Sequence, residues 1–324
     1  MLPADFPGSV FVVIHIPPHT PSRLPEILSA AGPMKAVHPK DGDKIQPGHI
    51  YVAEADRHLL VEGDRILVKS GPKENRFRPA VDALFRSAAY VYGPRVVGVI
   101  LSGALDDGTS GLWSIKRLGG LAVVQNPAEA EFVSMPNSAL EHVEVDHVLP
   151  IEQIGPLLCD LAAHPAPPAP AVPATELERL ALEISIATED GAFEKGIMGQ
   201  GELAPFSCPE CYGALVALKE SDRVRFRCHT GHAYTTSVLL AGITQANEER
   251  LWQAVRGFEE AAMLLEKVAA HFEGAGKADA AKLFLRKALD VRKRARVVHD
   301  SVLEAESLSE DIQQQTTDKA RNAE

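Results

Sequence analysis

Two adjacent carboxylates, Asp106 and Asp107, lie between Gly103 and Gly108, a few residues after an apolar run. That run, residues 96–101, is short and rich in β-branched side chains, which is typical of a strand covered on both faces of a parallel sheet. Residues 112–118 then follow a helical pattern. The carboxylates therefore fall at the carboxyl end of a strand, where open α/β sheets bind their ligands. The structural alternative is that Asp107 or Thr109 only caps the helix beginning near Ser110, and the spacing leaves both interpretations open.

A histidine follows a second apolar run in the same way. Residues 10–14 predict another buried strand, and His15 stands at its carboxyl end. A His and an Asp on two strand ends of one sheet could form a general base and the carboxylate that orients it. Such a pair also needs a nucleophile, and a lone His is more often structural than catalytic.

A group of cysteines with metal-ligand spacing lies in the C-terminal half. Cys208 and Cys211 have two residues between them, and after sixteen more residues Cys228 and His232 follow with three between them. Two such knuckles complete a tetrahedral set, the usual closed coordination of structural zinc. His229 is adjacent to Cys228 and would have to bend back, so His232 is the preferred fourth ligand. With all four positions filled by protein, no position is left for a catalytic water.

The segments around these cysteines favour a small β domain. Residues 214–218 and 224–227 flank Ser221 and Asp222 like a hairpin, so we predict a zinc ribbon within residues 176–240. Residues 164–175 before it form a Pro/Ala-rich linker, extended and with nothing to pack.

The elements around His15 and Asp107 alternate between strand and helix. Residues 59–61 and 66–68 predict a β-hairpin, residues 79–90 a helix, and residues 122–125 another buried strand, followed by a loop over 128–135. A strand at 148–149 and a helix carrying Ile154 close the domain. The fold class predicted for residues 1–163 is α/β, with a doubly wound and mostly parallel sheet.

The C-terminal part reads as helical. Apolar residues recur at helical spacing over residues 241–308 with a break at 274–276, which predicts an antiparallel helical hairpin. Residues 309–324 are polar, and we expect a disordered tail there.

Composition limits the class of protein. The 324 residues include 45% hydrophobic side chains, enough for two domains with cores. With 44 acidic and 33 basic residues the net charge is −11, which argues against a nucleic-acid partner. No apolar run approaches the roughly 20 residues needed to cross a bilayer and no secretory signal is evident, so we expect a cytoplasmic protein without membrane insertion. Three of four cysteines share one short segment, which favours metal over disulfides.

Five sequence blocks, in order, resemble the catalytic domain of the chemotaxis protein-glutamate methylesterases. They are residues 12–17, 47–53, 78–85, 101–108 and 134–139. The resemblance implies a serine hydrolase on a doubly wound sheet that removes methyl groups from glutamyl esters of chemoreceptors or related signalling proteins, some members also deamidating glutamine. It implies that His15 and Asp107 are the catalytic histidine and aspartate, and that Ala104 lies near the reacting centre, where the family has a backbone N–H and usually a Met side chain.

The resemblance departs at the nucleophile. The family places its Ser in a turn after the first strand, some two dozen residues ahead of the histidine, whereas this sequence starts fourteen residues before His15. We therefore expect a domain without that strand and turn, and no nucleophile in this chain. Ser102 is nearest the site but fits a packing or turn residue better. The chain as it stands is expected to be inactive on glutamyl methyl esters, and a version extended upstream to be active.

Two functions remain in competition. The first is a protein-glutamate methylesterase that works by a Ser-His-Asp mechanism, with the Ser missing from this chain. The alternative is a catalytically inactive signalling or docking protein that keeps the fold, favoured by the missing Ser and by the added ribbon and hairpin. A dinucleotide-binding protein is disfavoured because no Gly-x-Gly-x-x-Gly opens a helix. The sequence does not indicate the oligomeric state.

Overall fold

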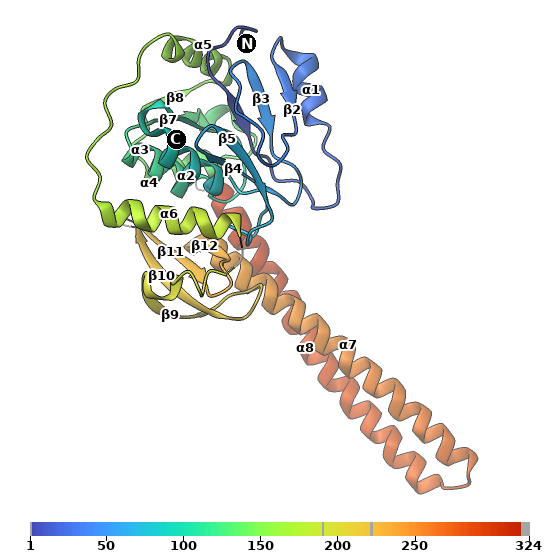
Figure 1. Cartoon of the computed structure of the whole chain (residues 1–324). Coiled ribbons are helices and arrows are strands. Elements are labelled where there is room, and N and C mark those ends of the chain that lie inside the picture. Colours follow the sequence, from blue (N-terminus) through green and yellow to red (C-terminus); the bar gives the residue numbers. More distant parts are fainter. Residues whose placement is uncertain (1, 190, 221–222, 319–324) are drawn as a thin grey trace. The chain divides into compact units, whose positions relative to one another are not determined.

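The computed structural model describes residues 2–189, 191–220 and 223–318, with side chains described as far as residue 303. The chain divides into two compact units, essentially Met1–Leu239 and Leu240–Gln315. Each unit is described separately below, and Figure 1 gives the order of the elements.

Two parallel sheets of three strands form the centre of the first unit. The first sheet has the order β1-β3-β2 and the second the order β6-β7-β8. Their bounds are β1 Val10–Val12, β2 Lys35–Val37, β3 His49–Val52, β6 Val97–Ile100, β7 Leu121–Gln125 and β8 His147–Leu149. The parallel α/β fold is confirmed. The single continuous sheet is not found, because within the described residues β1 and β6 are edge strands of separate sheets.

Helices pack on these sheets and supply the core. They are α1 Leu24–Ala31, α2 Val81–Tyr92, α3 Thr109–Arg117, α4 Ser134–His142 and α5 Ile151–Ala162, with short 3₁₀ turns at Gly93–Arg95 and Pro127–Glu129. The predicted hairpin is present as β4 (His58–Glu62) paired antiparallel with β5 (Arg65–Lys69). Leu112 and Ile115 of α3 pack with Ile100 of β6 and Val124 of β7. α4 was not predicted, and it holds together by burying Met135 and Ala139, one helical turn apart.

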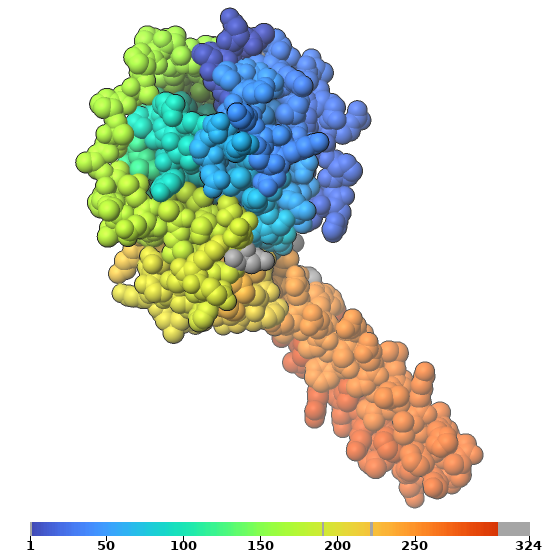
Figure 2. Space-filling model, viewed as in Figure 1, coloured from blue at the N-terminus to red at the C-terminus, as the bar shows by residue number. Residues whose placement is uncertain are grey.

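A further helix, α6 (Ala174–Thr188), packs against α2 and the β4-β5 hairpin in the region expected to belong to the ribbon. Its buried residues Ile186 and Ala187 join the cores on either side. Figure 2 shows the yellow-green surface of this region lying directly against the α/β layer. The linker expected over residues 164–175 has no helix or strand up to residue 173, and its last two residues belong to α6. It is not free of packing, because Pro170 fills the space beside Gly119.

An antiparallel sheet of four strands with the order β12-β11-β10-β9 completes the first unit. Its strands are β9 Glu202–Ser207, β10 Ala214–Glu220, β11 Arg223–Cys228 and β12 Ala233–Thr235, after a 3₁₀ turn at Ile197–Gly199. The predicted hairpin is confirmed by β10 and β11, in which Leu218 lies opposite Arg225. Its turn at Ser221 and Asp222 lies outside the described residues. We call this sheet with its cysteine-bearing loops, residues 202–235, the ribbon.

Buried charges join the ribbon to α6 and to the α/β layer. Arg225 pairs with Glu183 at 2.7 Å and with Glu220 at 2.6 Å. Arg227 pairs with Glu74 at 2.8 Å and with Glu183 at 3.1 Å, and Arg86 also contacts Glu74. The network therefore contains three Arg and three Glu, all buried. This balance of charge meets the main requirement for burying ions in a protein interior.

The second unit is an antiparallel pair of helices from α7 (Thr236–Gly274) and α8 (Ala278–Asp318). Its seam repeats every seven residues, as in a coiled coil: Val255, Ala262 and Ala269 on α7 and Ala281, Ala288, Ala295 and Val302 on α8 are buried. The hairpin and its break are as predicted. Of the expected disordered tail, residues 309–318 are assigned to α8, and residues 319–324 lie outside the described residues. No helix in the described ranges is long and apolar enough to cross a membrane.

Candidate functional site

His15 and Asp107 meet where the two parallel sheets adjoin. His15 follows β1, Asp107 follows β6, and the imidazole Nε2 lies 2.8 Å from the carboxylate Oδ2. The predicted contact is confirmed, although the two strands belong to separate sheets. The Asp107 side chain is 1% exposed while that of His15 is 21% exposed. One partner is therefore enclosed and the other can be reached from solvent.

Asp107 accepts further hydrogen bonds from the start of α2. The N–H of Val81 donates to its Oδ2 at 2.7 Å, and the N–H of Asp82 donates to its Oδ1 at 3.3 Å. The expected alternative role as a helix cap is thus realised on α2 and not on α3, the helix that follows it in sequence, which begins after Gly108 without a side-chain cap. The positive end of the α2 dipole faces this carboxylate.

These contacts keep Asp107 ionised. Burial raises the pKa of its carboxyl, but the hydrogen bond and charge of His15, together with the donors Val81 and Asn75, outweigh burial and lower the pKa below its usual value. The amide nitrogen of Asn75 donates to Oδ1 at 2.9 Å. A buried carboxylate that stays charged is suited to hold a neighbouring imidazole in one tautomer.

The His15 ring is fixed on its face as well as at its edge. Phe77 stacks on it with ring centroids 4.0 Å apart and planes 9° from parallel. Because Nε2 donates its proton to Asp107, the neutral ring carries its basic lone pair on Nδ1. Nδ1 is therefore the nitrogen available to accept a proton from a reacting group.

A second buried carboxyl, Asp82, lies beside the first. It accepts hydrogen bonds from Asn75 at 2.8 Å and from the Gly111 N–H at 2.6 Å. Burial, together with the charge of Asp107, raises the pKa of Asp82 to about 7. Gly111 allows α3 to approach α2 this closely, because a Cβ there would lie 2.5 Å from the Phe85 Cβ.

Ala104 is exposed in the loop that leads to Asp107. Two backbone hydrogen bonds hold the loop. The Gly103 N–H donates to the Phe132 carbonyl, and the Met135 N–H donates to the Gly103 carbonyl. Within the part of the chain that is described, the Ala104 N–H has no hydrogen-bond partner. It is thus open to a ligand, as the resemblance implies.

The serines near this site are engaged in structural contacts. The Ser102 hydroxyl accepts the Phe132 N–H at 2.9 Å, which is the turn role expected of it. The buried Ser110 hydroxyl donates to Glu220 of the ribbon at 2.8 Å.

The four predicted metal ligands come together at one end of the ribbon. Ligand atoms of Cys208, Cys211, Cys228 and His232 all lie within 4.8 Å of one another. The His232 Nδ1 is 3.6 Å from the sulfurs of Cys208 and Cys228, and the Cys211 and Cys228 sulfurs are 3.6 Å apart. All four cysteines of the chain are free thiols. The donor set and its spacing fit a tetrahedral zinc site.

The residues around the cluster support this fit. Glu210 Oε2 lies 3.6 Å from the Nε2 of His232, the arrangement by which a carboxylate orients a metal-binding imidazole. The Tyr234 hydroxyl lies 3.1 Å from the Cys208 sulfur. His229 does not join the cluster, and its ring packs against Gly213 instead, where a Cβ would overlap it.

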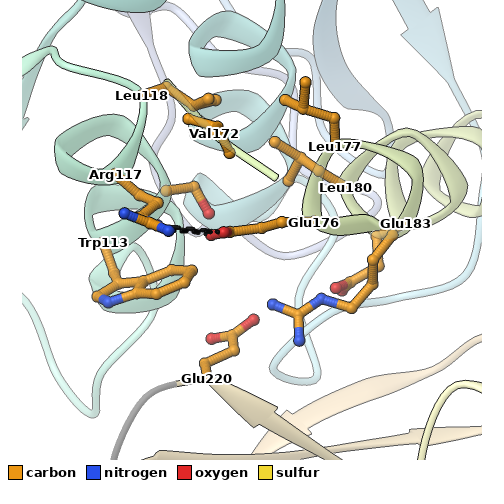
Figure 3. A pocket seen from close by; sticks show the side chains of 11 residues that line it. Trp113, Arg117, Leu118, Val172, Glu176, Leu177, Leu180, Glu183 and Glu220 are labelled. Carbon is orange, nitrogen blue, oxygen red and sulfur yellow. Dashed lines mark hydrogen bonds and ion pairs between the residues drawn. The ribbon is translucent and has the colours of Figure 1, made fainter. Parts of the chain in front are cut away.

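A cavity beside α3 and α6 is too small for a substrate. Trp113, Arg117 and Leu118 line one side, and Val172 and Glu176 line another, with Arg117 and Glu176 joined by an ion pair (Figure 3). Its volume is ≈ 20 Å³, enough for about one water molecule. The site around His15 therefore remains the better candidate for chemistry.

Sequence reasoning missed Asn75, Phe77 and the burial of Asp82. Asp82 falls within one of the five blocks of resemblance, residues 78–85, so the block marked the region without showing the role. Arg78, the first residue of that block, is bound to Asp56 and to the carbonyl groups of Ser70 and Gly71.

Comparison with known proteins matches the first half of the chain. A family model described as CheB methylesterase matches residues 1–158. The putative protein-glutamate methylesterase/protein-glutamine glutaminase of Leptospira interrogans is 40% identical over 161 residues, which cover 49% of this chain and 83% of that protein. Protein-glutamate methylesterase/protein-glutamine glutaminase 2 of Rhizobium johnstonii is 37% identical over 157 residues, and the matched part spans only 43% of its length. The crystal structure of the Thermotoga maritima CheB methylesterase catalytic domain is 32% identical, covers 49% of this chain and 87% of that one, and has a TM-score of 0.48.

Proposed function

Because this chain belongs to the CheB methylesterase family, we propose that it serves a protein-glutamate methylesterase reaction on chemoreceptor-type signalling proteins in the cytoplasm. The same site would deamidate glutamine side chains, the second activity in the names of its relatives. The observation that carries the proposal is the 2.8 Å contact between a partly exposed His15 and a buried, ionised Asp107.

In this mechanism His15 moves protons through Nδ1. The hydroxyl of the family's nucleophilic serine gives its proton to Nδ1 as the serine oxygen attacks the glutamyl carbonyl. Asp107 stabilises the imidazolium that results. The proton then passes to the departing methoxide, which leaves as methanol. Water attacks the acyl-enzyme, its proton passes through Nδ1 back to the serine oxygen, and the products are a free glutamate and the starting enzyme.

The developing oxyanion needs donors that are not already paired. The N–H of the exposed residue Ala104 meets this requirement, and it lies in the same loop as Asp107. A side chain such as the Met usual in the family is not available from an alanine. The backbone N–H would therefore carry this role.

The serine is the component that the family places ahead of this sequence. We assign none of the present serines to it, since Ser102 and Ser110 hold structural hydrogen bonds. The activity should therefore be measured on the protein made from the native gene. That protein includes any residues encoded in frame upstream of Met1.

That preparation should release methanol from a glutamyl methyl ester peptide and react with a fluorophosphonate probe. His15→Gln should lower kcat/KM by about 10³-fold or more, as expected when a triad loses its base. His49→Gln, at a partly buried histidine on β3 whose imidazole lies beside the Pro47 carbonyl, serves as the control and should keep the activity. Absence of both labelling and methanol release from the native product would favour a signalling or docking protein that keeps the fold without the chemistry.

We further propose that the cysteine cluster holds one structural zinc ion. The support is a set of four donors with suitable spacing and a carboxylate behind the histidine. The ion would tie the two knuckles of the ribbon together and contribute to its folding. Metal analysis should give about one zinc per chain. Cys208→Ser should lose it, and Cys159→Ser, at a cysteine outside the cluster, should keep it.

A further inference from the structure

The last ribbon strand, β12, runs beside the loop that carries Asn75. The Asn75 N–H donates to the Ala233 carbonyl at 2.8 Å, and the Ala233 N–H donates to the Lys73 carbonyl at 3.2 Å. The Thr235 N–H also reaches the side-chain oxygen of Asn75 at 3.3 Å. The loop at 73–75 is thus ordered by β12 much as a strand is ordered by its neighbour.

Asn75 transmits this order to the catalytic carboxylate. While its side-chain oxygen faces β12, its side-chain nitrogen donates to Asp107 at 2.9 Å and to Asp82 at 2.8 Å. The residue is buried and has a φ of 51°, a left-handed conformation that Asn tolerates better than most residues. One amide therefore links the ribbon backbone to Asp107.

A second link reaches the residue next to Asp107. The Thr235 hydroxyl donates to Asp106 Oδ1 at 2.9 Å, and the Ser237 hydroxyl donates to Asp106 Oδ2 at 2.6 Å. Asp106 is buried, so these two hydroxyls satisfy a carboxyl that could not be left unpaired without cost. β12 and the residues just after it thus hold the catalytic loop at two points.

We propose that the ribbon positions the catalytic aspartate, with Asn75 and Asp106 as the positioning residues through which it acts. This inference rests on the proposed function, because it assigns a support to the same His15 and Asp107 pair. The metal knuckle is part of the support, since His232 is adjacent to Ala233 in the strand that binds the Asn75 loop. Loss of the metal should therefore disturb the hydrogen bond between His15 and Asp107.

The test is the proton shared between His15 and Asp107, which gives a far-downfield NMR resonance identified by its absence in His15→Gln. In the full chain, Thr235→Val should abolish or broaden this resonance, and Thr235→Ser, which restores the hydroxyl, should recover it. Thr236→Val is the matched control. Its hydroxyl binds the Val224 carbonyl and does not contact the catalytic loop, so the resonance should persist. Asn75→Ala should also remove the resonance.

Metal removal provides a second, independent test of the proposal. Removing zinc with a chelator should abolish the resonance, and adding zinc back should restore it. A resonance that persists unchanged in Thr235→Val and after metal removal would overturn the proposal, as would an equal loss in Thr235→Val, Thr235→Ser and Thr236→Val. If Asn75→Ala fails to fold, the Thr235 pair and the metal arm decide the outcome.

The readout does not depend on ester hydrolysis. If the native gene product proves inactive while the resonance responds to Thr235 and to zinc, the proposed function fails and the positioning role stands. If the product is active and the resonance ignores the ribbon, the positioning role fails alone.

Discussion

Asp107 combines two tasks that a sequence shows only as alternatives. Its carboxylate caps α2 through the N–H groups of Val81 and Asp82 and at the same time orients His15. The cap supplies the donors that keep the buried carboxyl ionised, so the structural role makes the chemical role possible. A capping interpretation and a catalytic interpretation of one Asp therefore do not exclude each other.

Asp82 should make the stability of the chain depend on pH in an unusual sense. Its pKa rises to about 7 in the folded chain, from about 3.9 in an unfolded one. Between these values the folded state holds a proton that the unfolded state has lost, so stability from this group falls as pH rises, by up to about 1.4 kcal/mol per pH unit. Burial lowers the pKa of His58, which acts in the opposite sense, so the wild-type curve alone does not isolate Asp82.

The comparison with Asp82→Asn isolates it. This variant carries a neutral group of the same shape, and relative to wild type it should gain stability as pH rises from about 5 to about 7.5. Urea unfolding at both pH values measures the difference, with the exposed Asp5→Asn as control. Parallel pH curves for wild type and Asp82→Asn would show that Asp82 is ionised throughout.

Glu210 offers a test of the metal site that leaves all four ligands in place. Its carboxylate lies 3.6 Å from the His232 Nε2 and within 3.6 Å of Lys73 in the α/β layer. Glu210→Gln removes the charge that orients the imidazole, and should weaken zinc binding by about 10–100-fold. Competition with a chromophoric chelator gives the affinity, and Glu202→Gln on the exposed strand β9 is the control. Equal affinities for the two variants would mean that Glu210 does not support the ligand.

At the scale of elements, the sequence predicted the helices and strands that have a local hydrophobic pattern. Strands β1, β6 and β7 are apolar runs, and the β4-β5 and β10-β11 hairpins are two strand-forming runs separated by turn residues. The sequence therefore predicted these strands and hairpins. α6 was missed because its buried face includes Glu183, whose two arginine partners come from the ribbon. Such a face looks polar until the partners are known.

The same limit applies to the site. His15 and Asp107 could be predicted because each follows a recognisable strand. Asn75 could not, since it lies in a loop whose position depends on β12, more than 150 residues later in the chain. The burial of Asp82 depends on the close approach of α3 at Gly111, which no local pattern reveals.

The buried ion network should be fragile to the loss of one member. Arg225 is 2% exposed and pairs with two glutamates, so Arg225→Met leaves two buried carboxylates short of a partner. Breaking a buried pair in this way costs about 3–5 kcal/mol. Arg117→Met, which removes a pair that is 44% exposed on the arginine side, should cost about 1 kcal/mol or less. Chemical denaturation measures both, and similar losses would contradict a special role for the network.

At the scale of the whole molecule, the chain carries two kinds of stability. The first unit depends on a mixed core, a balanced ion network and a predicted metal, whereas the second depends on a seam of small apolar residues repeated every seven positions. Alanines in such a seam let two helix backbones approach closely, and their short side chains leave no room for a larger group.

A charge in the middle of that seam should therefore unfold the helical hairpin selectively. Ala288 is 1% exposed, so Ala288→Glu would bury a carboxylate with no partner. The free-energy cost of burying this charge exceeds the stabilisation that the small apolar side chains of the seam provide. Far-UV circular dichroism should show a large loss of helix, while the zinc content and the His15 resonance of the first unit persist because its core and network are complete within residues 1–239. Ala280→Glu, at a position outside the seam, is the control and should keep the helix. Loss of zinc or of the resonance in Ala288→Glu would show that the two units fold as one.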